Sequence, residues 1–181
     1  MKNNDLCKKI LFTGDEISKR CEEIALQIEK DVNGEEVVFL AVLNGSFMFA
    51  SELVKRYNGD CNIAFIQVST YGNGTETSCK FNVKKALTLD IKDKHVVIIE
   101  DIVDTGFTMV NLLKYLGEFN PSSIRICTMI DKPHRRTHEV NSDYIAYTMT
   151  EEHFIVGFGL DYSQKYRNLP YIGILKEEFY S

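Results

Sequence analysis

Three carboxylates and a hydroxyl-rich turn lie close together in one short stretch of the chain. The run Val96–Thr108 has an apolar segment, then Glu100 and Asp101, then Asp104, and it ends on Thr105, Gly106, Phe107 and Thr108. Small and hydroxylated residues at the start of a helix form an anion site, because free backbone N–H groups point outward and glycine permits close approach. Carboxylates beside an anion site suggest sugar hydroxyls or a cation. A phosphorylated ribose with bound Mg²⁺ meets both requirements, since Mg²⁺ favours carboxylates together with substrate phosphates.

The same run has a simpler interpretation. It could be a capped helix after a strand, with acidic residues favoured near the positive end of the helix dipole. An apolar strand, two adjacent carboxylates and a D-x-G-x-T turn in one run favour the ligand site instead. Other nucleotide-binding motifs are excluded, because the chain has no G-x-x-x-x-G-K-[ST] loop and no G-x-G-x-x-G after a strand.

The elements that must position these groups alternate between strands and helices. Apolar runs predict buried strands at Val37–Leu43, Cys61–Val68, His95–Ile99 and Ser123–Ile130, and shorter ones within Asp143–Met149, Phe154–Leu160 and Tyr171–Leu175. Helices are predicted after the capping-box pattern Thr13–Glu16, over Phe47–Tyr57 and around Thr108–Phe119. The polar segment Tyr71–Asn82 is expected to be a long mobile loop. This alternation predicts an α/β fold with a central, mostly parallel sheet flanked by helices, which binds ligands at the carboxyl ends of its strands.

Composition limits the classes of protein that the chain can belong to. Its 181 residues carry a net charge of −5, and this acidity argues against a nucleic-acid partner. The five cysteines are odd in number and contain no C-x-x-C pair, which fits a reducing cytoplasm better than a disulfide framework. No run approaches the roughly 18 apolar residues of a membrane span. We expect one domain, residues 1–181, that is soluble and cytoplasmic.

Several segments together resemble one enzyme family. The run Val96–Thr108 is similar to the phosphoribosyl-pyrophosphate (PRPP) motif of type I phosphoribosyltransferases. Segments that look like the hypoxanthine-guanine branch span nearly the whole chain; they are Val42–Phe47, Ser69–Gly72, Asp131–Arg136, Phe154–Tyr162 and Tyr166–Pro170. The resemblance implies the type I fold, with a small hood lobe built from the two chain termini. It also implies a homodimer or homotetramer.

The activity that this resemblance implies belongs to purine salvage. The 5-phosphoribosyl group of PRPP would pass to hypoxanthine, and to guanine, giving IMP or GMP and pyrophosphate, with Mg²⁺ as cofactor. Two alternatives stay open. One is a phosphoribosyltransferase that prefers xanthine, and the other is a regulatory protein that binds PRPP without turnover.

At the phosphate end, the resemblance assigns Glu100 and Asp101 to the ribose hydroxyls, directly or through the metal. The loop from Asp104 to Thr108 would hold the 5′-phosphate. Pyrophosphate would be bound by Arg167 and by the backbone of the loop Leu43, Asn44 and Gly45. Some family members have lysine at the position of Asn44, so the contribution of this side chain stays open.

At the base end, the resemblance makes Asp104 the general base or acid at the purine ring nitrogen, because that proton becomes acidic as the purine attacks the ribose. Lys132 matches the lysine that donates to the exocyclic oxygen. A lysine cannot accept a hydrogen bond, so it should favour 6-oxopurines over adenine. Phe154 matches the aromatic residue that stacks on the base, and the main chain of Ile155 would contact the base edge. The simpler interpretations are a solvated lysine and a core phenylalanine.

The remaining predictions concern a metal ligand, a closing loop, a pair of histidines and two acidic pairs. Asp161 matches a metal-binding acid beside the purine. Thr70 and Tyr71 match a Ser-Tyr pair on a closing loop that would exclude water from the reacting sugar. A metal site at His134 and His138 is disfavoured, because Pro133 and basic neighbours indicate a loop. The acidic pairs Glu151–Glu152 and Glu177–Glu178 are interpreted as solvated surface.

Overall fold

A computed structural model describes residues 6–71, 80–85 and 87–180. Its larger sheet has six strands in the order β4-β3-β2-β5-β6-β7. The five strands from β3 to β7 in that order are mutually parallel, and β4 pairs antiparallel with β3 at one edge. The strands are β2 (Val37–Leu43), β3 (Cys61–Tyr71), β4 (Lys80–Lys85), β5 (His95–Val103), β6 (Ser123–Asp131) and β7 (Tyr144–Thr148). The predicted central, mostly parallel sheet is therefore confirmed.

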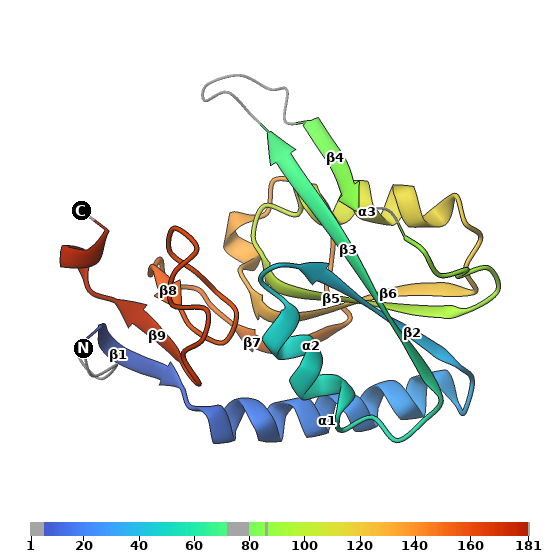
Figure 1. The fold of residues 1–181 in the computed structure, drawn as a ribbon, viewed down its shortest axis with the longest axis horizontal. Helices are drawn as coiled ribbons and strands as arrows, with labels where there is room; N and C mark the ends of the chain where they lie inside the picture. Colours follow the sequence, from blue (N-terminus) through green and yellow to red (C-terminus); the bar gives the residue numbers. More distant parts are fainter. Residues whose placement is uncertain (1–5, 72–79, 86, 181) are drawn as a thin grey trace.

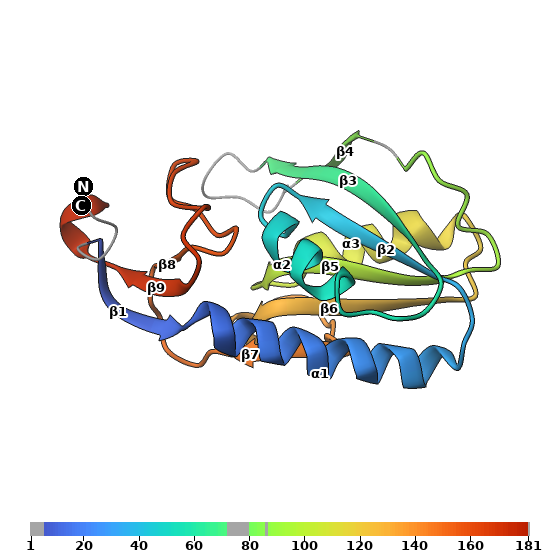
Figure 2. The same ribbon diagram turned by 60° about the horizontal axis from the view of Figure 1, so that its bottom comes forward.

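Helices cover both faces of this sheet. The helices α1 (Gly14–Val32) and α2 (Phe47–Val54) lie on one face, and α3 (Phe107–Gly117) lies on the other (Figures 1 and 2). Alternate residues of β2 pack on the two sides, with Phe39 in the core beneath α1 and α2 and Leu40 in the core beneath α3. A strand covered on both faces must be apolar throughout, and this explains the uninterrupted run in β2. As predicted, a capping box at Thr13 and Glu16 starts α1.

A second, smaller sheet is built from the two ends of the chain. It contains β1 (Cys7–Phe12), β9 (Ile172–Leu175) and β8 (Ile155–Val156), in the order β1-β9-β8, with both pairings antiparallel. In Figure 1 it lies on the side of the large sheet toward which β2 points, and both chain termini lie beside it. This is the arrangement expected of a hood lobe. It faces the edge where the parallel strands end.

Three sequence predictions need correction. The expected loop Tyr71–Asn82 begins and ends in strands, because Tyr71 closes β3 and Asn82 lies in β4, while residues 72–79 lie outside the described residues. Strand β4 was missed because its alternation is short, although Phe81 and Val83 pack against the core beneath α3. Within Phe154–Leu160 only Ile155 and Val156 form a strand, since Gly157 and Gly159 have φ angles of +100° and +102°.

Helix ends and chain chemistry complete the description. Helix α2 stops at Val54, three residues before the predicted end. The described cysteines, Cys7, Cys21, Cys61 and Cys127, are all free thiols, and Cys79 lies outside the described residues. No helix in the described part of the chain combines the length and the apolar character that crossing a membrane requires.

Candidate active site

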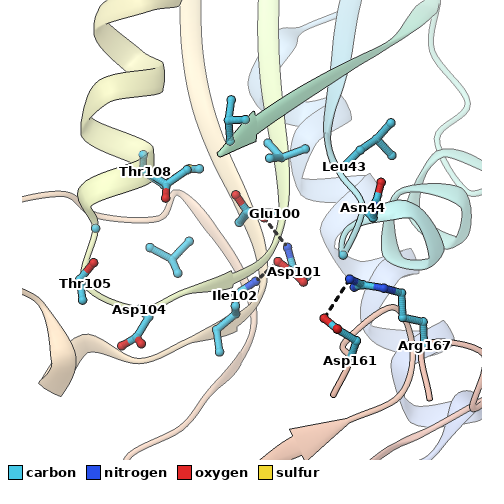
Figure 3. A pocket seen from close by; sticks show the side chains of 16 residues that line it. Leu43, Asn44, Glu100, Asp101, Ile102, Asp104, Thr105, Thr108, Asp161 and Arg167 are labelled. Atoms are coloured by element: carbon cyan, nitrogen blue, oxygen red, sulfur yellow. Dashed lines mark hydrogen bonds and ion pairs between the residues drawn. The ribbon is translucent and has the colours of Figure 1, made fainter. Parts of the chain in front are cut away.

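A pocket of about 530 Å³ opens where the parallel strands of the large sheet end. Three segments that are far apart in the sequence line it: the turn after β2, the end of β5 with the start of α3, and the loop after β8 (Figure 3). The predicted site residues that it brings together are Leu43, Asn44, Gly45, Glu100, Asp101, Asp104, Thr105, Gly106, Thr108, Asp161 and Arg167. The pocket therefore unites almost all residues that were assigned to the phosphate end.

Glu100 and Asp101 lie at the centre of this pocket, on the last residues of β5 (Figure 3). Burial raises the pKa of Glu100 well above its usual value, and the negative charge of Asp101 raises it further. Burial also raises the pKa of Asp101. The Asp101 N–H donates to Glu100 Oε1 at 3.2 Å, and the Ile102 N–H donates to Asp101 Oδ1 at 2.9 Å. Two adjacent buried carboxylates favour a ligand that supplies positive charge or hydroxyl donors.

Two glycines bring the lining segments into direct contact. A methyl group on Gly45 would lie 1.6 Å from Asp101 Oδ2, and one on Gly159 would lie 2.0 Å from the carbonyl oxygen of Gly45. Only glycine fits at either position without a shift of the backbone or of Asp101. The sequence prediction named Gly45 for its backbone and missed Gly159, although the G-x-G spacing in Gly157–Gly159 was a signal of close approach.

The start of α3 forms one wall of the pocket. Gly106 has a φ angle of +84° and no side chain to cap the helix, and Thr105 Oγ1 accepts a hydrogen bond of 3.4 Å from the Phe107 N–H. Thr105 and Thr108 line the pocket beside these backbone groups, which makes the helix start suitable for an anion. Phe107 differs from its neighbours, because its ring packs against His138 with centroids 5.3 Å apart and does not line the pocket. The phosphate contact predicted for Phe107 therefore stays a prediction about its backbone.

Asp161 and Arg167 face the acidic pair from the opposite side (Figure 3). They form an ion pair of 2.9 Å, and Arg167 also donates to the carbonyl oxygen of Gly159 at 2.7 Å. No group of three or more metal-ligating side chains occurs in the described ranges. Mg²⁺ commonly takes only one or two carboxylates and completes its shell with phosphates and water. The donor set of Glu100 and Asp101 therefore fits Mg²⁺ held jointly with a phosphorylated ligand.

Of the residues predicted for the base, Asp104 and Asp161 line this pocket, whereas Lys132, Phe154 and Ile155 do not. The side chain of Lys132 is only 9% exposed, and its Nζ lies 3.7 Å from Glu152 Oε2. Ile155 is buried in β8. Phe154 is 39% exposed, and its ring stacks on Tyr180 with centroids 5.0 Å apart. Phe154 also lines a second pocket of about 620 Å³ beside the small sheet. Lys132 is therefore too buried to be a solvated surface lysine, and Phe154 is too exposed to be a core residue.

Asp104 connects the phosphate end to the base end. Its Oδ1 accepts a hydrogen bond from Arg135 Nε at 2.8 Å, and Arg135 NH1 lies 3.5 Å from Glu152 Oε1. Arg136 joins the same loops by donating to the carbonyl oxygen of Val103 at 2.6 Å. Glu152 is exposed, as its interpretation as solvated surface requires, and its carboxylate also contacts basic side chains of the loop after β6. No local pattern in the sequence indicates these contacts, since the partners lie 17 or more positions away.

The two closing-loop residues lie at the end of β3. Thr70 pairs with Phe81 of β4, and Tyr71 pairs with Lys80. Their side chains lie outside what the structure describes.

Comparison with known proteins identifies similar sequences and folds. Residues 9–163 match the family model described as a phosphoribosyl transferase domain. The chain is 44% identical over 181 residues to hypoxanthine-guanine phosphoribosyltransferase of Streptococcus pneumoniae, covering 100% of this chain and 99% of that protein. It is 42% identical over 179 residues to the Staphylococcus aureus protein of the same name, covering 99% of each.

Solved structures agree with the sequence relatives. A crystal structure of a hypoxanthine phosphoribosyltransferase from Staphylococcus aureus superimposes with a TM-score of 0.93 at 40% identity, covering 100% of both chains. A hypoxanthine-guanine phosphoribosyltransferase from Bacillus anthracis superimposes with a TM-score of 0.88 at 38% identity, covering 94% of this chain and 99% of that one.

Proposed function

Because the chain belongs to the hypoxanthine-guanine phosphoribosyltransferase family, we propose that it transfers the 5-phosphoribosyl group of PRPP to hypoxanthine and guanine, forming IMP or GMP and pyrophosphate. One observation supports this most strongly. A single pocket joins the carboxylates of β5, the open start of α3 and the turn after β2. These are the three kinds of group that a phosphorylated sugar with a diphosphate substituent requires.

At the phosphate end, the backbone and hydroxyls of Thr105–Thr108 bind the 5′-phosphate, and Glu100 and Asp101 hold the ribose hydroxyls. The turn Leu43–Gly45 and the Arg167 guanidinium bind the pyrophosphate group. Mg²⁺, held by Glu100 and Asp101 with Asp161 in the same pocket, would neutralise negative charge on the leaving group. Burial raises the pKa of both central carboxylates and so disfavours their charged forms, whereas a bound cation would favour those forms.

At the base end, Lys132 donates to the 6-oxygen of the purine. Its Nζ lies beyond hydrogen-bond distance from Glu152, so its donors are available to a ligand. The Phe154 ring stacks on Tyr180 and is still 39% exposed, so its remaining surface is available to the base, and the backbone of Ile155 contacts the base edge. These three groups come from the end of β6 and the start of β8, so the base binds between the two sheets.

The chemical step is a substitution at the ribose C1′. The purine ring nitrogen forms a bond to C1′, the bond from C1′ to the pyrophosphate oxygen breaks, and the electron pair of that bond leaves with pyrophosphate. The ring proton of the purine passes to Asp104 Oδ2, which accepts no hydrogen bond within the described chain. Closure over Thr70 and Tyr71 excludes water, which would otherwise compete with the purine.

The test is an ultraviolet absorbance assay of the purified protein with PRPP and Mg²⁺, in which hypoxanthine, guanine, xanthine and adenine are offered separately. We expect turnover of hypoxanthine and guanine that stops when Mg²⁺ is chelated, and no turnover of adenine. Faster turnover of xanthine than of either would identify the xanthine-preferring enzyme. Binding of PRPP without turnover of any base would identify the regulatory protein.

We also propose that the protein is a homodimer or homotetramer in the cytoplasm. A groove of about 330 Å³ between α2 and β3 is lined by Phe47, Ile63 and Phe65, all of which are exposed in the single chain. Exposed apolar patches of this kind mark interfaces. Light scattering coupled to size exclusion should give a mass of two or four chains, and a monomer would contradict the proposal. The free thiols of the described cysteines fit a reducing compartment.

A further inference from the structure

One acidic side chain, Glu152, lies among three basic ones at the base end of the site. Its carboxylate is 2.8 Å from His134 Nε2, 3.5 Å from Arg135 NH1 and 3.7 Å from Lys132 Nζ. All three partners follow β6, whereas Glu152 precedes β8 by three residues. Glu152 therefore joins the loop that carries Lys132 to the segment that carries Phe154.

Lys132 depends on this carboxylate more than its neighbours do. Its side chain is almost buried, and within the described chain Glu152 is the only carboxylate within 4.0 Å of its Nζ. At 3.7 Å the pair attracts without a direct hydrogen bond, so Glu152 can orient the ammonium group while its donors stay available.

Arg135 extends the contact to the reacting end of the base. Its Nε donates to Asp104 Oδ1 at 2.8 Å, and its NH1 faces Glu152. The guanidinium group engages only one oxygen of Asp104. The rotation of the carboxylate is thereby restricted, and Oδ2 remains available as a proton acceptor.

We propose that Glu152 is a positioning residue for the base: it orients Lys132 toward the 6-oxygen and, through Arg135, holds Asp104 at the ring nitrogen. This inference rests on the proposed function, since it assigns a partner to Lys132 and to Asp104, the two residues that would hydrogen-bond to the purine. One ionic chain, Lys132–Glu152–Arg135–Asp104, then aligns both edges of the same ligand. The phosphate end has no contact with Glu152 in the described chain, so its affinity for PRPP should not depend on this residue.

The alternative is a surface cluster without effect on the reaction. Exposed ion pairs commonly contribute little to the stability of a protein, and the Glu152 side chain is 55% exposed. Glu151 offers a matched control, because it is the adjacent acid, is 80% exposed and pairs only with His153 among the described residues, at 2.8 Å. Glu151→Gln and Glu152→Gln make the same change of charge one position apart.

The experiment is steady-state kinetics of the wild type, Glu152→Gln, Glu151→Gln and Arg135→Ala, with hypoxanthine and PRPP varied in turn. For Glu152→Gln we expect the KM for hypoxanthine to rise about tenfold, the size of one lost charged contact, with the KM for PRPP within about twofold of the wild type. Arg135→Ala should lower kcat about tenfold, because Asp104 loses its orientation. Glu151→Gln should match the wild type.

Several results would overturn the inference. If Glu152→Gln behaves like Glu151→Gln, the cluster is only surface charge. If it raises both KM values equally, the effect is a general disturbance of the fold. In either case an active wild type leaves the proposed function intact. A wild type that turns over no 6-oxopurine removes the proposed function, and the positioning role is then rejected with it.

Discussion

The two ends of the site are built in different ways. At the phosphate end, Gly45 packs on the partly buried carboxylate of Asp101, and Gly159 packs on Gly45. At the base end, partly exposed side chains from two sheets meet through the ion pairs of Glu152. The phosphate end thus depends on where the backbone lies, whereas the base end depends on the charge and orientation of side chains.

This difference has a kinetic consequence. A change of backbone shape at the phosphate end should weaken PRPP binding whichever purine is used. A change of side chain at the base end should alter the KM or the choice of purine and leave PRPP binding intact. Each prediction below tests one side of that division.

The largest effect is expected at Asp104. Asp104→Asn keeps an oxygen for Arg135 but removes the proton acceptor, so kcat should fall by about 10²–10⁴-fold, the usual contribution of a general base. The KM for PRPP should stay within about twofold of the wild type. Steady-state kinetics with hypoxanthine gives both values, and an unchanged kcat would show that another group takes the proton.

Gly45→Ala should have the next largest effect. The new methyl group would lie 1.6 Å from Asp101 Oδ2, so the turn or the carboxylate must move. We expect the KM for PRPP to rise by about 10–100-fold, since a displacement near 1 Å can cost that much. Gly117→Ala is the control, because a methyl group there meets nothing within 4 Å. Equal kinetics for the two variants would argue against a close-packed phosphate end.

Phe154→Ala should raise the KM for hypoxanthine about 5–150-fold, which corresponds to a stacking contribution of about 1–3 kcal/mol. Phe119→Ala is the matched control, because Phe119 is 38% exposed against 39% for Phe154 and packs on Tyr115 in another part of the molecule. An unchanged KM for hypoxanthine in Phe154→Ala would mean that the ring serves packing alone.

The smallest effect concerns stability. Burial raises the pKa of Glu100 and of Asp101 in the folded state, so the folded protein binds protons more tightly than the unfolded chain does. This contribution to stability is complete below the unfolded pKa values and is lost as the pH rises through the folded ones. At pH 7 the pair therefore destabilises the fold. Asp101→Asn should therefore raise the Tm of the ligand-free protein at pH 7, by about 2–4 °C for each kcal/mol gained in the free energy of unfolding. The rise should be smaller at pH 5.

Thermal melts of the wild type and Asp101→Asn across that pH range provide the measurement. The same variant should lose most of its activity, because it removes a group that the proposed function assigns to the ribose hydroxyls. A lower Tm at pH 7 would indicate that the negative charge of Asp101 stabilises the fold.

The phosphate end could be predicted from the sequence because its central residues are contiguous. Glu100 to Thr108 follow the predicted apolar run His95–Ile99, although β5 continues to Val103, and the carboxyl ends of parallel strands meet at one edge. Strand β4 could not be predicted in the same way, since a short edge strand carries a weak alternation. The contact of Arg135 with Asp104 joins residues 31 positions apart. No periodicity or local motif carries that information, and the fold alone creates the contact.

The most direct measurement compares the ratio of kcat/KM for hypoxanthine to that for adenine in the wild type and in Lys132→Gln. The buried ammonium group can only donate, so the wild type should turn over hypoxanthine and reject adenine. A glutamine amide can both donate and accept, and the ratio should fall by about 100-fold or more, while the KM for PRPP stays within about twofold. A Lys132→Gln variant that still rejects adenine and keeps its activity on hypoxanthine would contradict recognition of the 6-oxygen by Lys132.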